Sequence, residues 1–104
     1  MKNGGNTMDI KNNTKALWEY LCDAFELEEI EAAFEATIEG FEYQPAKINA
    51  EMIDALSDQK AQSLLFDINY MAVNELFGGD FGTWNEVLTY SLGFDEETID
   101  FLNY

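Results

Sequence analysis

The residues with the clearest chemical potential in this chain are glutamates that recur at helical spacing. They lie in the stretch EEIEAAFEATIEGFE, which runs from residue 28 to residue 42. The row consists of Glu28, Glu31, Glu35, Glu39 and Glu42. Side chains three or four residues apart are neighbours on a helix surface, so these carboxylates are predicted to form one stripe about 21 Å long. We interpret this stripe as the partner-binding surface.

The uniform sign of the stripe indicates that its partner is positively charged. Like charges at this spacing destabilise a helix by about 0.2–0.5 kcal/mol per pair, and no Lys or Arg interrupts the row. A helix that needs only solubility would usually mix the two signs. If Gly40 ends the helix, Glu42 leaves the stripe and four carboxylates remain.

Catalysis and metal binding find little support in the remaining residues. The chain has no His and no Arg, and Cys22 is its single cysteine, so an activated thiolate would lack its usual partners. Zinc sites are built mainly from Cys and His. The segment Asp80–Glu86 does not match the calcium loop of an EF-hand. We therefore predict no enzymatic activity, no cofactor and no metal site.

Composition favours a single folded domain with a strongly acidic surface. The 104 residues are 47% hydrophobic, which is enough for a compact core. The net charge of −16 would repel nucleic acid and anionic membranes, and it would attract a basic protein surface. No basic residue lies between Lys15 and Lys47 or after Lys60. Without a long apolar run or an apolar leader, the sequence predicts a soluble, cytoplasmic protein.

The periodicity of apolar residues predicts an all-α fold, a compact bundle of five to six short-to-medium helices with short connections. Residues 1–12 are expected to form a flexible leader, and residues 13–104 a single helical domain. The first helix is predicted to begin after a cap at Asn13 or Thr14. The later caps are predicted, in chain order, at Asn49, Ser57, Thr83 and Asp95. The segment 58–77 carries the widest apolar arc, which is typical of a central helix.

By composition and size the chain resembles the broad class of acidic phage-borne DNA mimics and anti-defence inhibitors. The resemblance implies an inhibitor of the anti-CRISPR or anti-restriction type that blocks the nucleic-acid-binding surface of a basic protein, such as a nuclease or a defence effector. Duplex DNA carries one charge per about 3.4 Å along each strand, whereas the glutamate row advances about 4.5–6 Å per charge. Other acidic residues would therefore have to supply a second row.

Two further interpretations remain open at the level of sequence. An immunity or antitoxin protein would bind one basic toxin through a few aromatic anchors, for which the candidates are Tyr43, Tyr90 and Tyr104. A structural or adaptor domain would have no electrostatic target, and it would self-associate through leftover apolar surface.

Overall fold

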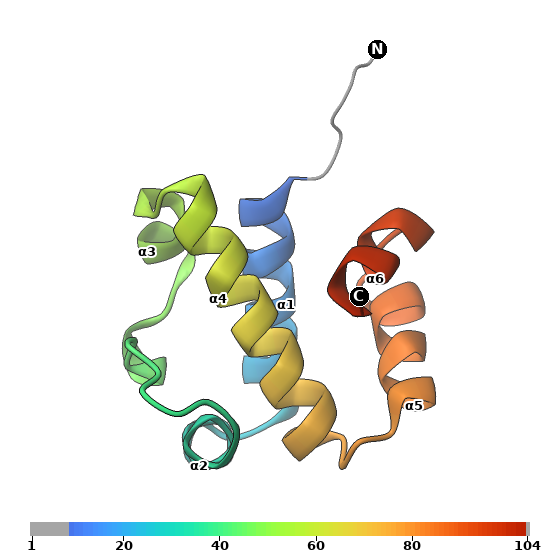
Figure 1. The fold of residues 1–104 in the computed structure, drawn as a ribbon, viewed down its shortest axis with the longest axis horizontal. Helices are drawn as coiled ribbons and strands as arrows, with labels where there is room; N and C mark the ends of the chain where they lie inside the picture. The colour runs from blue at the N-terminus through green and yellow to red at the C-terminus, as the bar shows by residue number, and fades with distance from the viewer. Residues whose placement is uncertain (1–8, 104) are drawn as a thin grey trace.

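The fold is organised around α4 (Asp58–Met71), which crosses the middle of the molecule (Figure 1). The computed structural model describes residues 9–103. Within this range the chain forms six α-helices and no strand, so the predicted all-α bundle is confirmed. The other five helices are α1 (Ile10–Ala24), α2 (Leu27–Thr37), α3 (Ala50–Ala55), α5 (Phe81–Glu86) and α6 (Glu96–Asn103).

Helix α4 is central because it buries a broad apolar face in the core, while its other side, which includes Gln62 and Tyr70, is exposed. Its side chains Leu64, Leu65, Ile68 and Met71 are fully buried. Helix α1 packs along it, while α2 and α3 lie to one side and α5 and α6 to the other (Figure 1). The radius of gyration, 13.3 Å, agrees with the value of about 13 Å for a compact domain of 100 residues. The prediction of a central helix over this segment is therefore confirmed.

Two of the helices continue into wider π-helical turns. Helix α4 runs on into η2 (Ala72–Leu76), and α5 runs on into η3 (Val87–Ser91). Each turn is followed by glycine in the left-handed region, at Gly78 after η2 and at Gly93 after η3. Glycine adopts this conformation without the steric penalty of a Cβ atom, so the chain can reverse there. A short 3-10 turn, η1 (Pro45–Lys47), connects α2 to α3.

The predicted caps of the middle and last helices are confirmed. The side chain of Asn49 accepts a hydrogen bond from the backbone N–H of Met52 at 2.8 Å. Ser57 Oγ accepts one from the N–H of Lys60 at 3.2 Å. Asp95 accepts one from the N–H of Thr98 at 2.8 Å. Each bond satisfies a helix N–H group that has no partner within its own helix.

The predicted start of the first helix was wrong. Helix α1 begins at Ile10, where the carboxylate of Asp9 accepts hydrogen bonds from the backbone and side-chain amides of Asn12. Thr14 lies buried inside the helix, and its hydroxyl donates to the carbonyl of Ile10 at 2.7 Å. Residues 10–12 therefore belong to the first helix. Residues 1–8 lie outside the described range.

The predicted capping box at Thr83 was also wrong. Asp80 caps α5 instead, because its two carboxylate oxygens accept from the backbone N–H of Thr83 at 3.0 Å and from its hydroxyl at 2.8 Å. A carboxylate that binds both groups competes effectively with the hydroxyl as a cap. The helix consequently starts three residues earlier than the pattern predicts, at Phe81.

A candidate acidic groove beside the second helix

The predicted glutamate stripe is shorter in the structure than in the sequence pattern. Glu28, Glu31 and Glu35 lie on α2, whereas Glu39 and Glu42 follow its end and leave the helix. The prediction that the helix runs to residue 42 was therefore wrong; the alternative that it stops at Gly40 is nearer, although Glu39 also leaves the helix. Glu35 follows Glu28 by seven positions, so the helical part of the row is about 10 Å long.

Helix α2 ends before Gly40 because the chain turns back to stack two aromatic rings. The last hydrogen bond of the helix joins the N–H of Ile38 to the carbonyl of Phe34 at 2.8 Å. Gly40 follows with a φ of 71°, which reverses the chain direction. The ring of Phe41 then lies parallel to that of Phe34, with 4.0 Å between the centroids and 10° between the planes. A continued helix would place these two side chains about two turns apart.

The returning segment is held in place by aromatic contacts and by one buried hydrogen bond. Phe41 contacts Tyr43 edge to face, with centroids 5.7 Å apart. On the other side of the stack, Phe34 contacts the ring of Trp18 in α1. The indole Nε1 of Trp18 donates to the carbonyl of Ile48 at 3.0 Å, and both residues are buried. This bond fixes the far end of the segment on α1.

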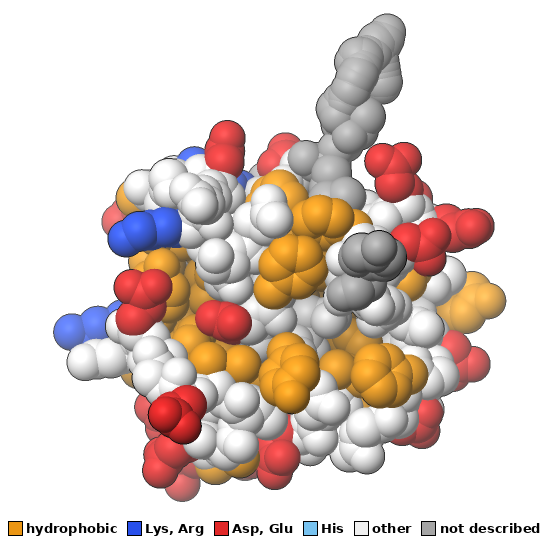
Figure 2. Space-filling model, in the orientation of Figure 1, with side chains coloured by type: hydrophobic (Ala, Val, Ile, Leu, Met, Phe, Trp, Pro, Cys, Tyr) orange, Lys and Arg blue, Asp and Glu red, His pale blue; other side chains and the backbone are white. Residues whose placement is uncertain are grey.

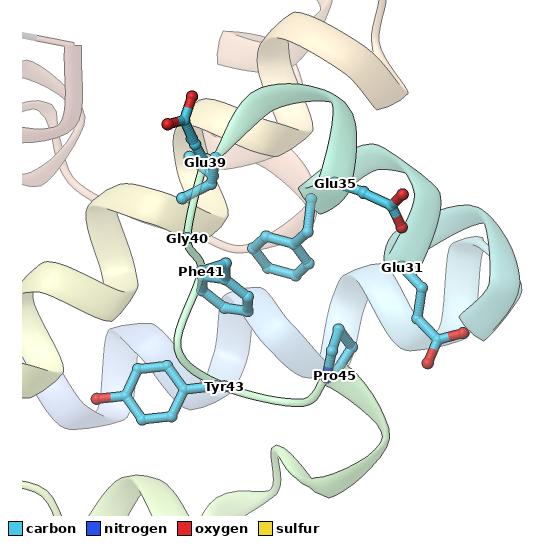
Figure 3. Close-up of a pocket in the computed structure, with 9 residues that line it drawn as sticks. Glu31, Glu35, Glu39, Gly40, Phe41, Tyr43 and Pro45 are labelled. Carbon is cyan, nitrogen blue, oxygen red and sulfur yellow. The ribbon is translucent and has the colours of Figure 1, made fainter.

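A groove of about 550 Å³ lies between α2 and this returning segment (Figure 3). We call it the acidic groove and define it by its lining. The lining residues are Glu31, Phe34, Glu35, Ile38, Glu39, Gly40, Phe41, Tyr43 and Pro45. Figure 3 shows Glu31, Glu35 and Glu39 spread along the α2 side with their carboxylates pointing outward, while Phe41, Tyr43 and Pro45 lie on the returning segment. The structure thus brings three of the five predicted site residues around one apolar concavity.

Glu28 and Glu42 do not line this groove. Glu28 lies in the first turn of α2, where a carboxylate interacts favourably with the helix dipole. Glu42 lies near Asp67 of α4, which is itself half-buried. Burial raises the pKa of Asp67, and the negative charge of Glu42 raises it further. The pKa of Tyr43 is raised by burial and then by the same two carboxylates.

The negative charge of the molecule is almost entirely exposed and uncompensated. Every Asp and Glu of the chain is exposed except Asp67, which is half-buried. Within residues 9–103 the single ion pair joins Lys15 Nζ to Asp54 Oδ1 at 2.8 Å. Lys11 also binds Asp54, through its carbonyl oxygen at 3.0 Å. On the face shown in Figure 2, acidic side chains lie along the edges of the molecule on both sides, whereas lysines appear only on the left side.

The predicted aromatic anchors differ in their exposure. Tyr90 is 82% exposed, and Tyr43 is half-buried in the groove. Tyr104 lies outside the described residues. Cys22 is partly exposed on α1, and burial, followed by the charge of Asp23, raises the pKa of its thiol.

Sequence reasoning missed the apolar half of the groove. Ile38 and Phe41 match the helical period, which predicts that they lie on the buried face of a longer helix. Pro45 alone predicts only a connection. The sequence did contain a signal, the pair Gly40 and Pro45. A glycine and a proline that flank a short segment can mark a chain reversal.

The described residues contain neither a candidate metal site nor a candidate membrane span. No group of three His, Cys, Asp or Glu side chains between residues 9 and 103 is arranged to hold a metal ion. No helix in that range has the length and apolar character needed to cross a bilayer. No family model, curated protein or solved structure matches this chain. The acidic groove and the surrounding charge are therefore the features from which a function can be inferred.

Proposed function

We propose that this protein is an acidic inhibitor that occupies the nucleic-acid-binding surface of a basic protein and acts by binding, without catalysis. The observation that supports the proposal is the exposed, uncompensated charge: a net charge of −16 with one ion pair among residues 9–103. A protein that binds DNA or RNA presents Lys and Arg side chains to phosphate groups. Exposed carboxylates can occupy the same side chains and exclude the nucleic acid.

The mechanism is competition assisted by long-range attraction. Complementary charge accelerates encounter at low salt, and the effect weakens as the Debye length falls to about 10 Å at 0.1 M ionic strength. The shortened helical row cannot reproduce the phosphate spacing of a DNA strand by itself. The acidic groove offers a different contribution, since Glu31, Glu35 and Glu39 surround apolar surface that a partner can bury. A defence nuclease of the CRISPR or restriction type in the bacterial cytoplasm fits this requirement for a basic partner.

The proposal is tested by affinity capture from a bacterial lysate at about 0.1 M salt, followed by elution with duplex DNA in one arm and by salt up to about 0.5 M in the other. Nucleic-acid-binding proteins should be released in both arms, because DNA and carboxylates compete for the same basic surface. A purified nuclease obtained in this way should lose its DNA binding when the protein is added. Captured proteins that resist both DNA and salt would contradict competitive mimicry.

A matched pair of variants locates the inhibitory surface. In the first, Glu31, Glu35 and Glu39 are replaced with Lys, which should abolish inhibition while the helical circular dichroism is kept. The control replaces three exposed acids on other helices, Glu19→Lys, Glu86→Lys and Asp100→Lys, and changes the net charge equally. Strong inhibition by the first variant, or equal loss in both, would exclude the groove side of α2 as the contact surface.

The exposure of Tyr90 favours a second candidate, an immunity protein that neutralises one particular toxin. An aromatic side chain that is 82% exposed can act as an anchor in a partner's pocket. For this function Tyr90→Ala should weaken the complex by about ten-fold or more, and the complex should persist at 0.5 M salt. The DNA-mimic function predicts little effect of Tyr90→Ala.

A further inference from the structure

We propose that the acidic groove binds an arginine side chain of the basic partner. This inference rests on the proposed function and assigns to its contact surface a specific ligand group. The methylene stem would lie against the apolar lining at Phe41 and Tyr43, and the guanidinium would bind the carboxylate of Glu35 or that of Glu39 at the edge of the groove.

The floor and walls of the groove suit a flat, weakly hydrated cation. Phe41 and Tyr43 are half-buried, so each ring leaves part of its surface open to the groove. Ile38 and Pro45 add apolar contacts. Arginine stacks on aromatic faces and packs its methylene stem along apolar surface while its charged end remains near water. A strongly hydrated ammonium group gains less from such a floor.

The glutamates at the edge of the groove, which we call its rim, complement the positive charge of the same cation. Glu31, Glu35 and Glu39 are exposed, and among the described residues no hydrogen bond or ion pair engages their carboxylates. No basic residue lines the groove. A guanidinium can bind a carboxylate through two parallel N–H donors, which fixes its orientation as well as its charge.

The groove is already formed in the free protein. The stack of Phe34 on Phe41 and the hydrogen bond from Trp18 to Ile48 hold the returning segment against α1 and α2. Binding would therefore not have to order the segment first, and preformed sites lose less entropy on binding. A second copy of this chain is a poor occupant, because the sequence contains no Arg and each copy carries a charge of −16.

The inference is tested on the isolated protein by NMR titration with N-acetyl-arginine N-methylamide at low salt. The matched control is N-acetyl-citrulline N-methylamide, which keeps the shape of arginine but has no charge. The arginine probe should shift the backbone amide signals of residues 38–43 most strongly, and it should saturate in the millimolar range, since single exposed ion pairs are weak. The citrulline probe should shift these signals much less.

Variants at the rim separate the groove from general attraction to a negative protein. The double variant Glu35→Gln with Glu39→Gln should weaken binding of the arginine probe by about five-fold. The control double variant, Glu86→Gln with Asp100→Asn, loses the same charge elsewhere and should bind nearly as well as the unmodified protein. Equal weakening in both, shifts spread over the whole molecule, or an equal response to N-acetyl-lysine N-methylamide would overturn the assignment.

This experiment can fail independently of the proposed function. It contains no nucleic-acid-binding partner, so it reports only on the groove and its ligand. The groove could fail to select arginine while DNA still displaces the protein from a captured nuclease. In that case inhibition would come from the charged surface as a whole. If the groove binds arginine selectively but no captured partner is displaced by DNA, the assignment of the groove stands and the proposed inhibitor function is refuted.

Discussion

Asn69 connects three helices through its buried side-chain amide. Its Oδ1 accepts from Trp84 Nε1 at 2.7 Å, which joins α4 to α5. Its Nδ2 donates to the carbonyl of Leu102 at 3.3 Å, which joins α4 to α6. Trp84 is fully buried, so no solvent can replace a lost partner of its indole N–H. The packing of the C-terminal helices on α4 therefore includes one polar residue in an apolar surrounding.

Replacing Asn69 with Ala should lower the free energy of unfolding by about 1–3 kcal/mol, because it leaves a buried donor and a buried carbonyl unpaired. Urea denaturation followed by tryptophan fluorescence measures the change. The control is Asn74→Ala, which removes an amide that bonds only to the carbonyl of Tyr70 on its own helix. The control should change the same free energy by less than about 0.5 kcal/mol. Similar losses for the two variants would show that the buried network contributes little.

Asp67 is expected to destabilise the fold at neutral pH. Its pKa in the folded protein is raised, by burial first and then by Glu42, so the folded state disfavours its ionised form. Asp67→Asn removes the charge and keeps the shape. We expect the midpoint of thermal unfolding to rise by about 1–3 °C at pH 7, a small effect because the group is only half-buried.

The pH dependence of this effect has a defined sign. A raised folded pKa means that the folded state holds its proton more tightly than the unfolded state. The stability linked to Asp67 is therefore complete below the ordinary pKa of 3.8 and is lost as the pH rises through the folded pKa. The advantage of Asp67→Asn should vanish below about pH 3.5 in calorimetric scans. A constant advantage at every pH would assign the effect to packing.

At the scale of elements, the carboxylate of Asp80, which caps α5, stabilises the fold at neutral pH, whereas Asp67 destabilises it. The pKa of Asp80 is lowered, mainly by the hydrogen bond from the backbone N–H of Thr83 and then by that from its hydroxyl. Its stabilising contribution is present above the ordinary pKa and is lost as the pH falls through the lower folded pKa. Asp80→Ala should therefore lower the unfolding midpoint by about 4–8 °C at pH 7, measured by circular dichroism.

A conservative variant at Asp80 distinguishes the contribution of the capping hydrogen bond from that of the negative charge. Asp80→Asn retains an oxygen that can accept from Thr83, so it should keep most of the thermal stability at pH 7. It should also lack the acid-dependent loss below pH 3.8 that the carboxylate produces. If Asn and Ala at this position lower the midpoint equally, the negative charge is more important than the hydrogen bond.

The elements themselves were largely predictable, and the groove was only half predictable. Apolar periodicity and the caps at Asn49 and Ser57 are local signals, so they define α3 and α4 from sequence alone. The end of α2 depends on a contact between Phe34 and Phe41 that forms only after the chain reverses at Gly40. The same sequence pattern is compatible with a continued helix and with a chain reversal, and only tertiary packing decides which of the two forms. The carboxylates were therefore identified without the aromatic surface that they surround.

At the scale of the whole molecule, self-repulsion should make stability depend on salt. A net charge of −16 with one ion pair among residues 9–103 leaves few attractive interactions for salt to weaken. Screening should instead reduce repulsion between carboxylates such as Glu31 and Glu35, which are neighbours on α2. The unfolding midpoint should rise by about 3–6 °C between 0.02 M and 0.3 M sodium chloride.

The variant with Glu19→Lys, Glu86→Lys and Asp100→Lys supplies the control for this salt effect. It carries less negative charge, so its midpoint should start higher at low salt and rise less. Calorimetry of both proteins across the same salt series measures the difference. A midpoint that falls with salt in the unmodified protein would show that attractive pairs outweigh repulsion.

Cys22 gives this molecule one natural position for chemical labelling. Its thiol is accessible on α1, and the chain has no second cysteine to compete for a maleimide dye or a nitroxide. Because the pKa of the thiol is raised, conjugation should proceed slowly at neutral pH and faster in mildly alkaline buffer. A fluorophore attached there would report complex formation by anisotropy without altering any residue of the acidic groove.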